Sequence, residues 1–186
     1  MQATRCRICT HRRIIQTEIQ ASRCHPSTMP TASTDPIRGT SQLRKGRASI
    51  PGQIYHVIAK THQQRRLLAE LTTGRIVVNC LRHENELNRA RTLSFVVMPD
   101  HLHWLLQLGD ESALSRVVHN VKSNSARQIN STRKRYCAVW QRGFYDRAIR
   151  SEDDLPAIAR YIVANPMRAG IARSCREYPH WDSIFL

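Results

Sequence analysis

Two histidines separated by a single residue, His101 and His103, are the side chains in this sequence best suited to hold a metal ion. Side chains alternate across a β-strand, so both imidazoles would face the same way, with their Cα atoms roughly 6.5 Å apart. At that spacing two rings can reach one divalent ion. The alternative is a pair of half-buried histidines with a structural role. The opposite face of this predicted strand is entirely apolar, with Leu102, Trp104, Leu106 and Leu108.

A second candidate group lies near the C-terminus, where Tyr161 and Asn165 are four residues apart. On a helix this spacing stacks two side chains on one side. Hard ions such as Mg²⁺ and Mn²⁺ take oxygen ligands, so Asn165 could complete a histidine site while Tyr161 attacks a phosphate bound there. The alternative is that Tyr161 packs at the edge of the core and Asn165 caps the C-terminus of its helix.

The charge of the chain favours nucleic acid as the partner. The net charge is +15, with 9 basic and 2 acidic side chains in residues 1–50 and 20 and 12 in the remainder. Basic side chains bind phosphates and release condensed counterions. Trp140 or Phe144 could stack on bases. The alternatives are that Trp140 belongs to the core and that Lys122 and Arg127 lie on a solvated helix face. The phosphate-binding candidates are Lys122, Arg127, Arg133, Lys134 and Arg135.

The chain divides into a tail and one domain. Residues 1–47 lack apolar periodicity and predict a basic, disordered extension, whereas residues 48–186 are long enough for a single core. The extension carries Cys6, Cys9 and Cys24, which offer a weak alternative as a zinc site. Because no stretch resembles a membrane span or a signal peptide, we expect a cytoplasmic protein with no membrane association.

The positioning elements can be predicted from residue patterns. Residues 54–59 and 93–98 are rich in β-formers, and Pro99-Asp100 predicts a turn into the histidine strand. A helix is expected around residues 76–81, with Gly74 leaving its start open.

A second helix runs on from Leu114, with Asp110 or Ser112 as its N-cap. Residues 139–149 predict a strand or strand-like arm, and a last helix, capped within residues 151–154, should stop before Pro166. The order of elements predicts an α+β, ferredoxin-like antiparallel sheet with helices on one face and a further C-terminal helix.

Six linked motifs occur in order along the domain. They are SIPG at 49–52, YHV at 55–57, MPDHLH at 98–103, VKS at 121–123, WQRGFYD at 140–146 and YIVANP at 161–166. Through these motifs the sequence resembles, between about Gly46 and Trp181, the REP-associated tyrosine transposases, relatives of the IS200-like single-strand transposases in the HUH superfamily. The resemblance implies a ferredoxin-like fold, a divalent metal on His101 and His103, a nucleophilic Tyr161 on a helix, and Asn165 where relatives place a polar third ligand.

Tyr145 is the competing nucleophile, since it lies in one of these motifs. We rank it second because it falls on a predicted strand, whereas the tyrosine of the family lies on the following helix.

The activity implied by the resemblance is cleavage and rejoining of single-stranded DNA near hairpin, REP-like palindromes through a 5′-phosphotyrosine. Such a protein would be cytoplasmic and associated with the bacterial nucleoid, as a monomer or a homodimer. A non-catalytic regulator that binds hairpin DNA is the alternative.

Overall fold

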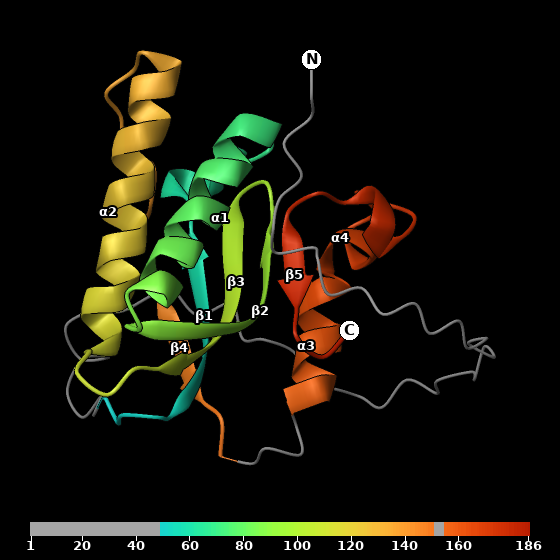
Figure 1. Ribbon diagram of the computed structural model, residues 1–186. Coiled ribbons are helices and arrows are strands. Elements are labelled where there is room, and N and C mark those ends of the chain that lie inside the picture. Colours follow the sequence, from blue (N-terminus) through green and yellow to red (C-terminus); the bar gives the residue numbers. More distant parts are fainter. Residues whose placement is uncertain (1–48, 151–154) are drawn as a thin grey trace, which may run out of the picture. The chain divides into compact units, whose positions relative to one another are not determined.

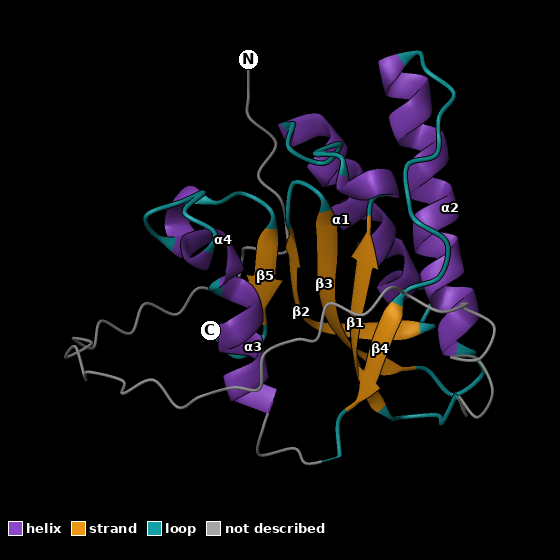
Figure 2. Cartoon of the chain, turned by 180° about the vertical axis from the view of Figure 1, so that it is seen from behind, coloured by secondary structure: helices purple, strands orange, loops and turns teal. Residues whose placement is uncertain are grey.

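The computed structural model describes residues 49–150 and 155–186, and within them the chain builds one five-stranded antiparallel sheet. The spatial order of the strands is β4-β1-β3-β2-β5, which places β3 at the centre, paired with β1 on one side and β2 on the other (Figures 1 and 2). The strands are β1 (Ile54–Lys60), β2 (Ala90–Val97), β3 (His101–Leu108), β4 (Tyr145–Ala148) and β5 (Trp181–Ser183).

The helices lie on both sides of this sheet. Helices α1 (Leu71–Glu86) and α2 (Leu114–Arg133) cover one face, and α3 (Leu155–Val163) lies on the other (Figure 1). The order β1-α1-β2-β3-α2-β4 and the strand arrangement confirm the predicted ferredoxin-like α+β fold. Short helical segments complete the chain: His62–Gln64, α4 (Asn165–Arg168) and Cys175–Glu177.

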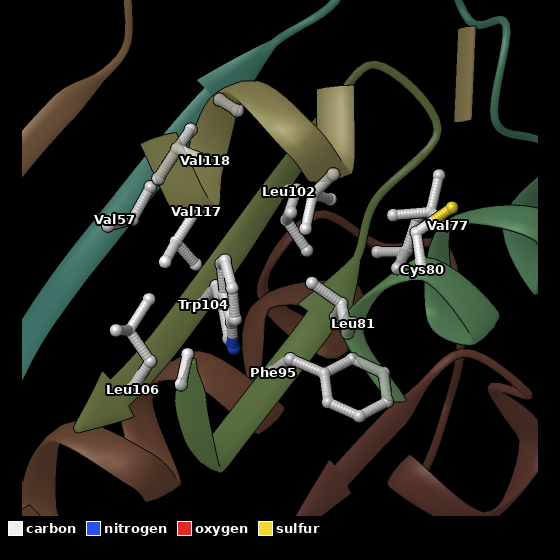
Figure 3. Close-up of a cluster of buried hydrophobic side chains, with 14 of the residues drawn as sticks. Val57, Val77, Cys80, Leu81, Phe95, Leu102, Trp104, Leu106, Val117 and Val118 are labelled. Carbon is white, nitrogen blue, oxygen red and sulfur yellow. The ribbon is translucent and has the colours of Figure 1, made fainter. Parts of the chain in front are cut away.

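The main core fills the space between the sheet and helices α1 and α2 (Figure 3). Trp104 and Leu106 of β3 point into it together with Val57 of β1, as the alternation of the strand predicts. Burying one such aliphatic side chain contributes about 1.5–3 kcal/mol. The indole N–H of Trp104 donates to the hydroxyl of Thr92 at 3.1 Å, so the ring is buried without an unpaired donor.

A second, smaller core forms on the opposite face, where α3 packs. The buried stripe of α3 includes Ala159 and Ile162, which lie against Leu105 of β3 and Val96 of β2. Helix α3 ends at Val163, before Pro166 as predicted. The proline occupies the first turn of α4, where its missing N–H leaves no helical hydrogen bond unmade.

Two sequence predictions need correction, and one strand was not predicted. Neither Asp110 nor Ser112 caps α2, because the hydroxyl of Ser49 accepts the hydrogen bond from the backbone N–H of Leu114 at 3.0 Å. The strand expected at residues 139–149 is confined to β4. The sequence patterns did not predict β5, whose three residues are too few to show a strand period.

Gly74 lies inside the first turn of α1, and the ring of His180 packs directly against it. A Cβ atom at position 74 would lie 2.5 Å from Nε2 of His180. Glycine therefore allows the segment leading into β5 to approach α1.

The predicted N-terminal extension, its three candidate zinc ligands and the predicted cap of the last helix lie outside the described residues. Across the two described ranges, no helix has both the length and the apolar character needed to cross a bilayer.

Candidate active site

The two histidines of the HxH motif face each other on the central strand. His103 is buried, with 6% of its surface exposed, and His101 at the start of β3 is partly exposed. Their Nε2 atoms are 3.1 Å apart. Because β3 is paired on both sides, its backbone fixes where these two rings can lie.

Each histidine has a partner on its other ring nitrogen. Nδ1 of His101 lies 2.6 Å from a carboxylate oxygen of Asp100, and Nδ1 of His103 lies 3.2 Å from Nε2 of His56. The carboxylate of Asp100 only accepts hydrogen bonds, so Nδ1 of His101 carries the proton and its Nε2 keeps the lone pair. Metal binding at Nε2 of His103 would require the proton of that ring to lie on Nδ1, where it would be donated to His56. In that state both Nε2 lone pairs would be open to one ion.

His56 reaches this position through the register of β1 against β3. It pairs with Leu105, and Ile58 pairs with His103, so His56 and His103 are diagonal neighbours on one face. Their rings stack, with centroids 5.4 Å apart and an interplanar angle of 23°.

Burial keeps the inner histidines uncharged at neutral pH. It lowers the pKa of His103 to about 3, with further lowering by the charges of His101 and His56. Burial, followed by the charge of Arg147, lowers the pKa of His56 to about 4. Only a neutral imidazole can bind a metal, so His103 is in the right protonation state for ligation.

The arrangement fits a divalent ion held by two imidazoles. Neighbouring ligands of an octahedral ion, each about 2.1 Å from the metal, lie about 3 Å apart, and the two Nε2 atoms match that separation. Among the residues that the structure describes, no group of three or more His, Cys, Asp or Glu side chains is placed to hold a metal. A complete ligand set would therefore need another kind of donor, such as an amide or phosphate oxygen.

Tyr161 and Asn165 lie on and just after the helix that covers the histidine face. Helix α3 packs against β2, β5 and β3 through its buried stripe. Tyr161 lies beside that stripe, and 46% of the surface of the tyrosine is exposed. The guanidinium of Arg168 lies 4.5 Å from the centre of the tyrosine ring. The candidate nucleophile is thus accessible and has a positive charge beside it, an electrostatic setting suited to a phosphate.

Asn165 acts as the cap of α3. Its side-chain nitrogen Nδ2 donates to the carbonyl of Tyr161 at 2.9 Å and to that of Ile162 at 3.1 Å. This is the alternative role that the sequence allowed. Both hydrogen bonds use the amide nitrogen, which cannot bind a metal, so they do not occupy the amide oxygen.

Tyr145, the competing nucleophile, lies on strand β4 as predicted. It pairs with Ile58, which in turn pairs with His103, so all three side chains lie on one face across adjacent strands. Its exposed fraction is 59%. Tyr145 is therefore exposed on the histidine face and is the second candidate nucleophile. The variants Tyr161→Phe and Tyr145→Phe separate the two tyrosines.

The candidate DNA-binding side chains differ in their availability. The ammonium of Lys122 donates to the carbonyls of Gln141 and Gly143, and burial lowers its pKa to about 8. Lys122 therefore holds the chain before β4. Arg133 forms an ion pair with Glu70 at 3.1 Å.

The remaining basic candidates are more accessible. Arg127 donates to the side chain of Asn124 on the exposed side of α2, and Lys134 and Arg135 are exposed after the helix. Trp140 is only 8% exposed, and its indole donates to Ser125, so it belongs to the core and is not a stacking surface. Phe144 is partly buried against the same core.

Comparison with known proteins decides the family. The family model described as "Transposase IS200 like" matches residues 49–165, a range that includes both histidines, Tyr161 and Asn165. The chain belongs to the IS200-like transposase family.

Relatives of this IS200-like transposase include two curated proteins. It is 29% identical over 99 residues to a putative REP-associated tyrosine transposase of Haemophilus influenzae, covering 48% of this chain and 56% of that protein. It is 30% identical over 91 residues to the REP-associated tyrosine transposase of Escherichia coli, covering 46% and 50%. The chain thus aligns with only about half the length of these relatives.

A solved structure has the same fold. The REP-associated tyrosine transposase bound to a REP hairpin superposes with a TM-score of 0.60 at 20% identity, covering 73% of this chain and 79% of that one. At this identity the likeness supports the ferredoxin-like fold.

Sequence reasoning missed two residues of this IS200-like site. The sequence patterns place Asp100 in a turn and in a family motif but give it no role at the site, although its position directly before His101 allows its carboxylate to reach that ring. His56 was quoted only as part of a motif, because nothing local relates it to a histidine 47 positions away.

Proposed function

We propose that this protein is a divalent-metal-dependent endonuclease and strand transferase for single-stranded DNA, with His101 and His103 as metal ligands and Tyr161 as nucleophile. The observation that carries the proposal is the pair of Nε2 atoms 3.1 Å apart, each on a ring whose Nδ1 already has a partner. Mg²⁺ or Mn²⁺ fits this site, and Asn165 can add its amide oxygen. The family and the basic charge support DNA as the substrate.

The proposed reaction is a transesterification. The hydroxyl of Tyr161 loses its proton to solvent, and its oxygen bonds to phosphorus. The bond from phosphorus to O3′ breaks, and O3′ takes up a proton, which leaves a 5′-phosphotyrosine and a free 3′-hydroxyl. A bound divalent ion would polarise a non-bridging oxygen of that phosphate. Attack by another 3′-hydroxyl on the phosphotyrosine reverses the step and rejoins DNA.

Hairpin DNA is the proposed target class. The structural relative was solved with a REP hairpin, and both curated relatives carry REP-associated names. The same likeness fits the second candidate, a regulator that binds hairpins without cutting them.

The test incubates end-labelled hairpin oligonucleotides carrying single-stranded flanks with the wild type and with Tyr161→Phe, with Mn²⁺ or with a chelator. We expect cleavage only in the wild type with metal, and hairpin binding in both proteins. Cleavage that persists in the chelator, or in Tyr161→Phe, would contradict the assignment. Binding without cleavage by the metal-loaded wild type would favour the regulator.

A further inference from the structure

The loop that follows α2 carries an unusual tyrosine. Tyr136 is 100% exposed, whereas the other aromatic residue nearby, Trp140, is buried. Within the described residues the ring of Tyr136 gains no stabilisation from burial, and its whole face is available to stack on a ligand.

The loop is held in shape on both sides of this ring. The backbone carbonyl of Asn130 accepts the N–H of Arg135 at 3.0 Å, and the side-chain nitrogen of Asn130 donates to the carbonyl of Cys137 at 3.0 Å. These two bonds flank Tyr136. A guanidinium nitrogen of Arg65 donates to the carbonyl of Ala138 at 3.1 Å. Hydrogen bonds therefore hold the backbone on both sides of the ring, which lowers the entropy cost of ordering this loop when a ligand binds.

The charge around the ring is of one sign. Residues 112–145 contain seven basic side chains and no aspartate or glutamate. Lys134 and Arg135 directly precede Tyr136 and are exposed. Arg133, one residue earlier, is paired with Glu70 from α1. An exposed aromatic beside exposed cations is the combination that binds single-stranded nucleic acid, through base stacking and phosphate contacts.

The loop also returns to the end of the sheet where the histidine strand begins. The carbonyl of Val139 accepts the N–H of His62, and the N–H of Thr61, one residue earlier, donates to the carbonyl of Asp100. Asp100 is the partner of His101. In Figure 2 the loop descends from the projecting end of α2 towards the sheet. A strand whose phosphate lies at the histidines could therefore continue onto this loop.

We propose that residues 133–138 bind single-stranded DNA next to the cleavage position, with Tyr136 stacking on an unpaired base and Lys134 and Arg135 binding phosphates. This inference rests on the proposed function, because it assumes a DNA strand at the histidine site. It adds a recognition surface that lies outside the proposed catalytic residues.

The test measures binding of a fluorescent single-stranded oligonucleotide of mixed sequence, with and without 2-aminopurine as a stacking reporter. Stacking on one base is worth about 1–3 kcal/mol, so Tyr136→Leu should weaken binding roughly 5- to 150-fold. Tyr136→Phe keeps the ring and should bind within about twofold of the wild type. The quenching of 2-aminopurine should be lost in Tyr136→Leu and kept in Tyr136→Phe.

Salt dependence separates stacking from charge. Removing one phosphate contact to a single strand should reduce the slope of log K against log salt by about 0.7. Arg135→Ala should show that reduction, whereas Tyr136→Leu should lower affinity with the slope unchanged. Arg176→Ala, which removes an exposed arginine elsewhere in the chain, is the matched control and should change neither.

Several results would overturn the inference. Tyr136→Leu could bind as tightly as the wild type, Tyr136→Phe could bind as weakly as Tyr136→Leu, or Tyr136→Leu could change only the oligomeric state or the unfolding midpoint. Tyr161→Phe should bind the same oligonucleotide normally, which separates this inference from the catalytic assignment. If the wild type binds no DNA, the proposed function fails, and this inference fails with it.

Discussion

The histidine cluster and the tyrosine helix belong to the same face of the sheet but are held in different ways. His103 lies in the central strand, is buried, and has hydrogen-bond partners for both of its ring nitrogens. Tyr161 lies on a helix that covers the sheet through a separate small core, and nearly half of its surface is exposed. The position of the proposed metal ligands is therefore fixed by strand register, whereas the proposed nucleophile lies on the exposed side of a helix that packs against the sheet.

This difference suits a reaction in which the nucleophile becomes attached to DNA. Metal ligands need fixed positions, because ligand angles and distances decide affinity. A tyrosine that carries a DNA end must leave room for the second strand that attacks it. We expect substitutions in one half of the site, or in the packing that supports the fold, to have separable effects, which are given from the largest to the smallest.

Removal of either metal ligand should abolish cleavage. His101→Ala or His103→Ala leaves a single imidazole, and loss of the ion's charge stabilisation is worth several kcal/mol, or about 10³-fold or more in rate. Single-turnover cleavage of a labelled oligonucleotide measures the loss. His119→Ala, an exposed histidine on α2, is the matched control and should cleave normally. Full activity in His103→Ala would show that cleavage does not depend on a metal ion bound by His103.

Loss of His56 should weaken metal binding without removing a ligand. His56→Ala leaves Nδ1 of His103 without its partner, and outer partners of this kind are worth about 10- to 100-fold in metal affinity. His56→Gln can restore part of the effect, because its amide can occupy the same hydrogen bond. Mn²⁺ titration followed by electron paramagnetic resonance measures affinity independently of cleavage. Equal affinities in wild type and His56→Ala would show that the stacked pair is only structural.

Gly74→Ala should destabilise the protein while leaving His101 and His103 untouched. At an ordinary helical position this change stabilises by about 1 kcal/mol. Here the added methyl group would collide with the buried ring of His180, and overpacking costs about 1–3 kcal/mol. Urea unfolding should therefore show a lower midpoint, and the double variant with His180→Ala should recover part of it. A higher midpoint in Gly74→Ala would mean that the ring has room to move.

Substitutions at Asn165 separate its two proposed roles. Asn165→Asp cannot donate to the carbonyls of Tyr161 and Ile162, and its charge opposes the helix dipole, so it should cost about 0.5–1 kcal/mol of stability. A carboxylate can take the place of the proposed amide ligand, so Mn²⁺ affinity should be kept. Asn165→Ala should lose stability and affinity together. Unchanged affinity in Asn165→Ala would leave Asn165 as a helix cap alone.

The sequence predicted local features well and long-range contacts poorly. The two faces of β3 followed from alternation, and the stripe of α3 followed from helical spacing, because each depends only on neighbouring residues. The contact between His56 and His103 depends on the register of β1 against β3, which no local pattern encodes. The cap of α2 likewise comes from Ser49, 65 positions away from the N–H that it accepts.

The remaining differences between prediction and structure concern polar side chains that can bind more than one kind of partner. Lys122 was expected to bind phosphate because of its charge, yet its ammonium holds the backbone before β4. Asn165 has both a donor and an acceptor, and the structure shows the donor in use. In each case residue type defined the possible chemistry, and tertiary contacts selected the partner.

The most direct test of the central claim is to locate the covalent bond to DNA. The wild-type protein is incubated with Mn²⁺ and an oligonucleotide that it cleaves, digested with protease, and the nucleotide-bearing peptide is sequenced by mass spectrometry. We predict a 5′-phosphate attached to Tyr161, with no adduct in Tyr161→Phe and a normal adduct in Tyr145→Phe. An adduct on Tyr145, or cleavage without any protein–DNA bond, would contradict this prediction.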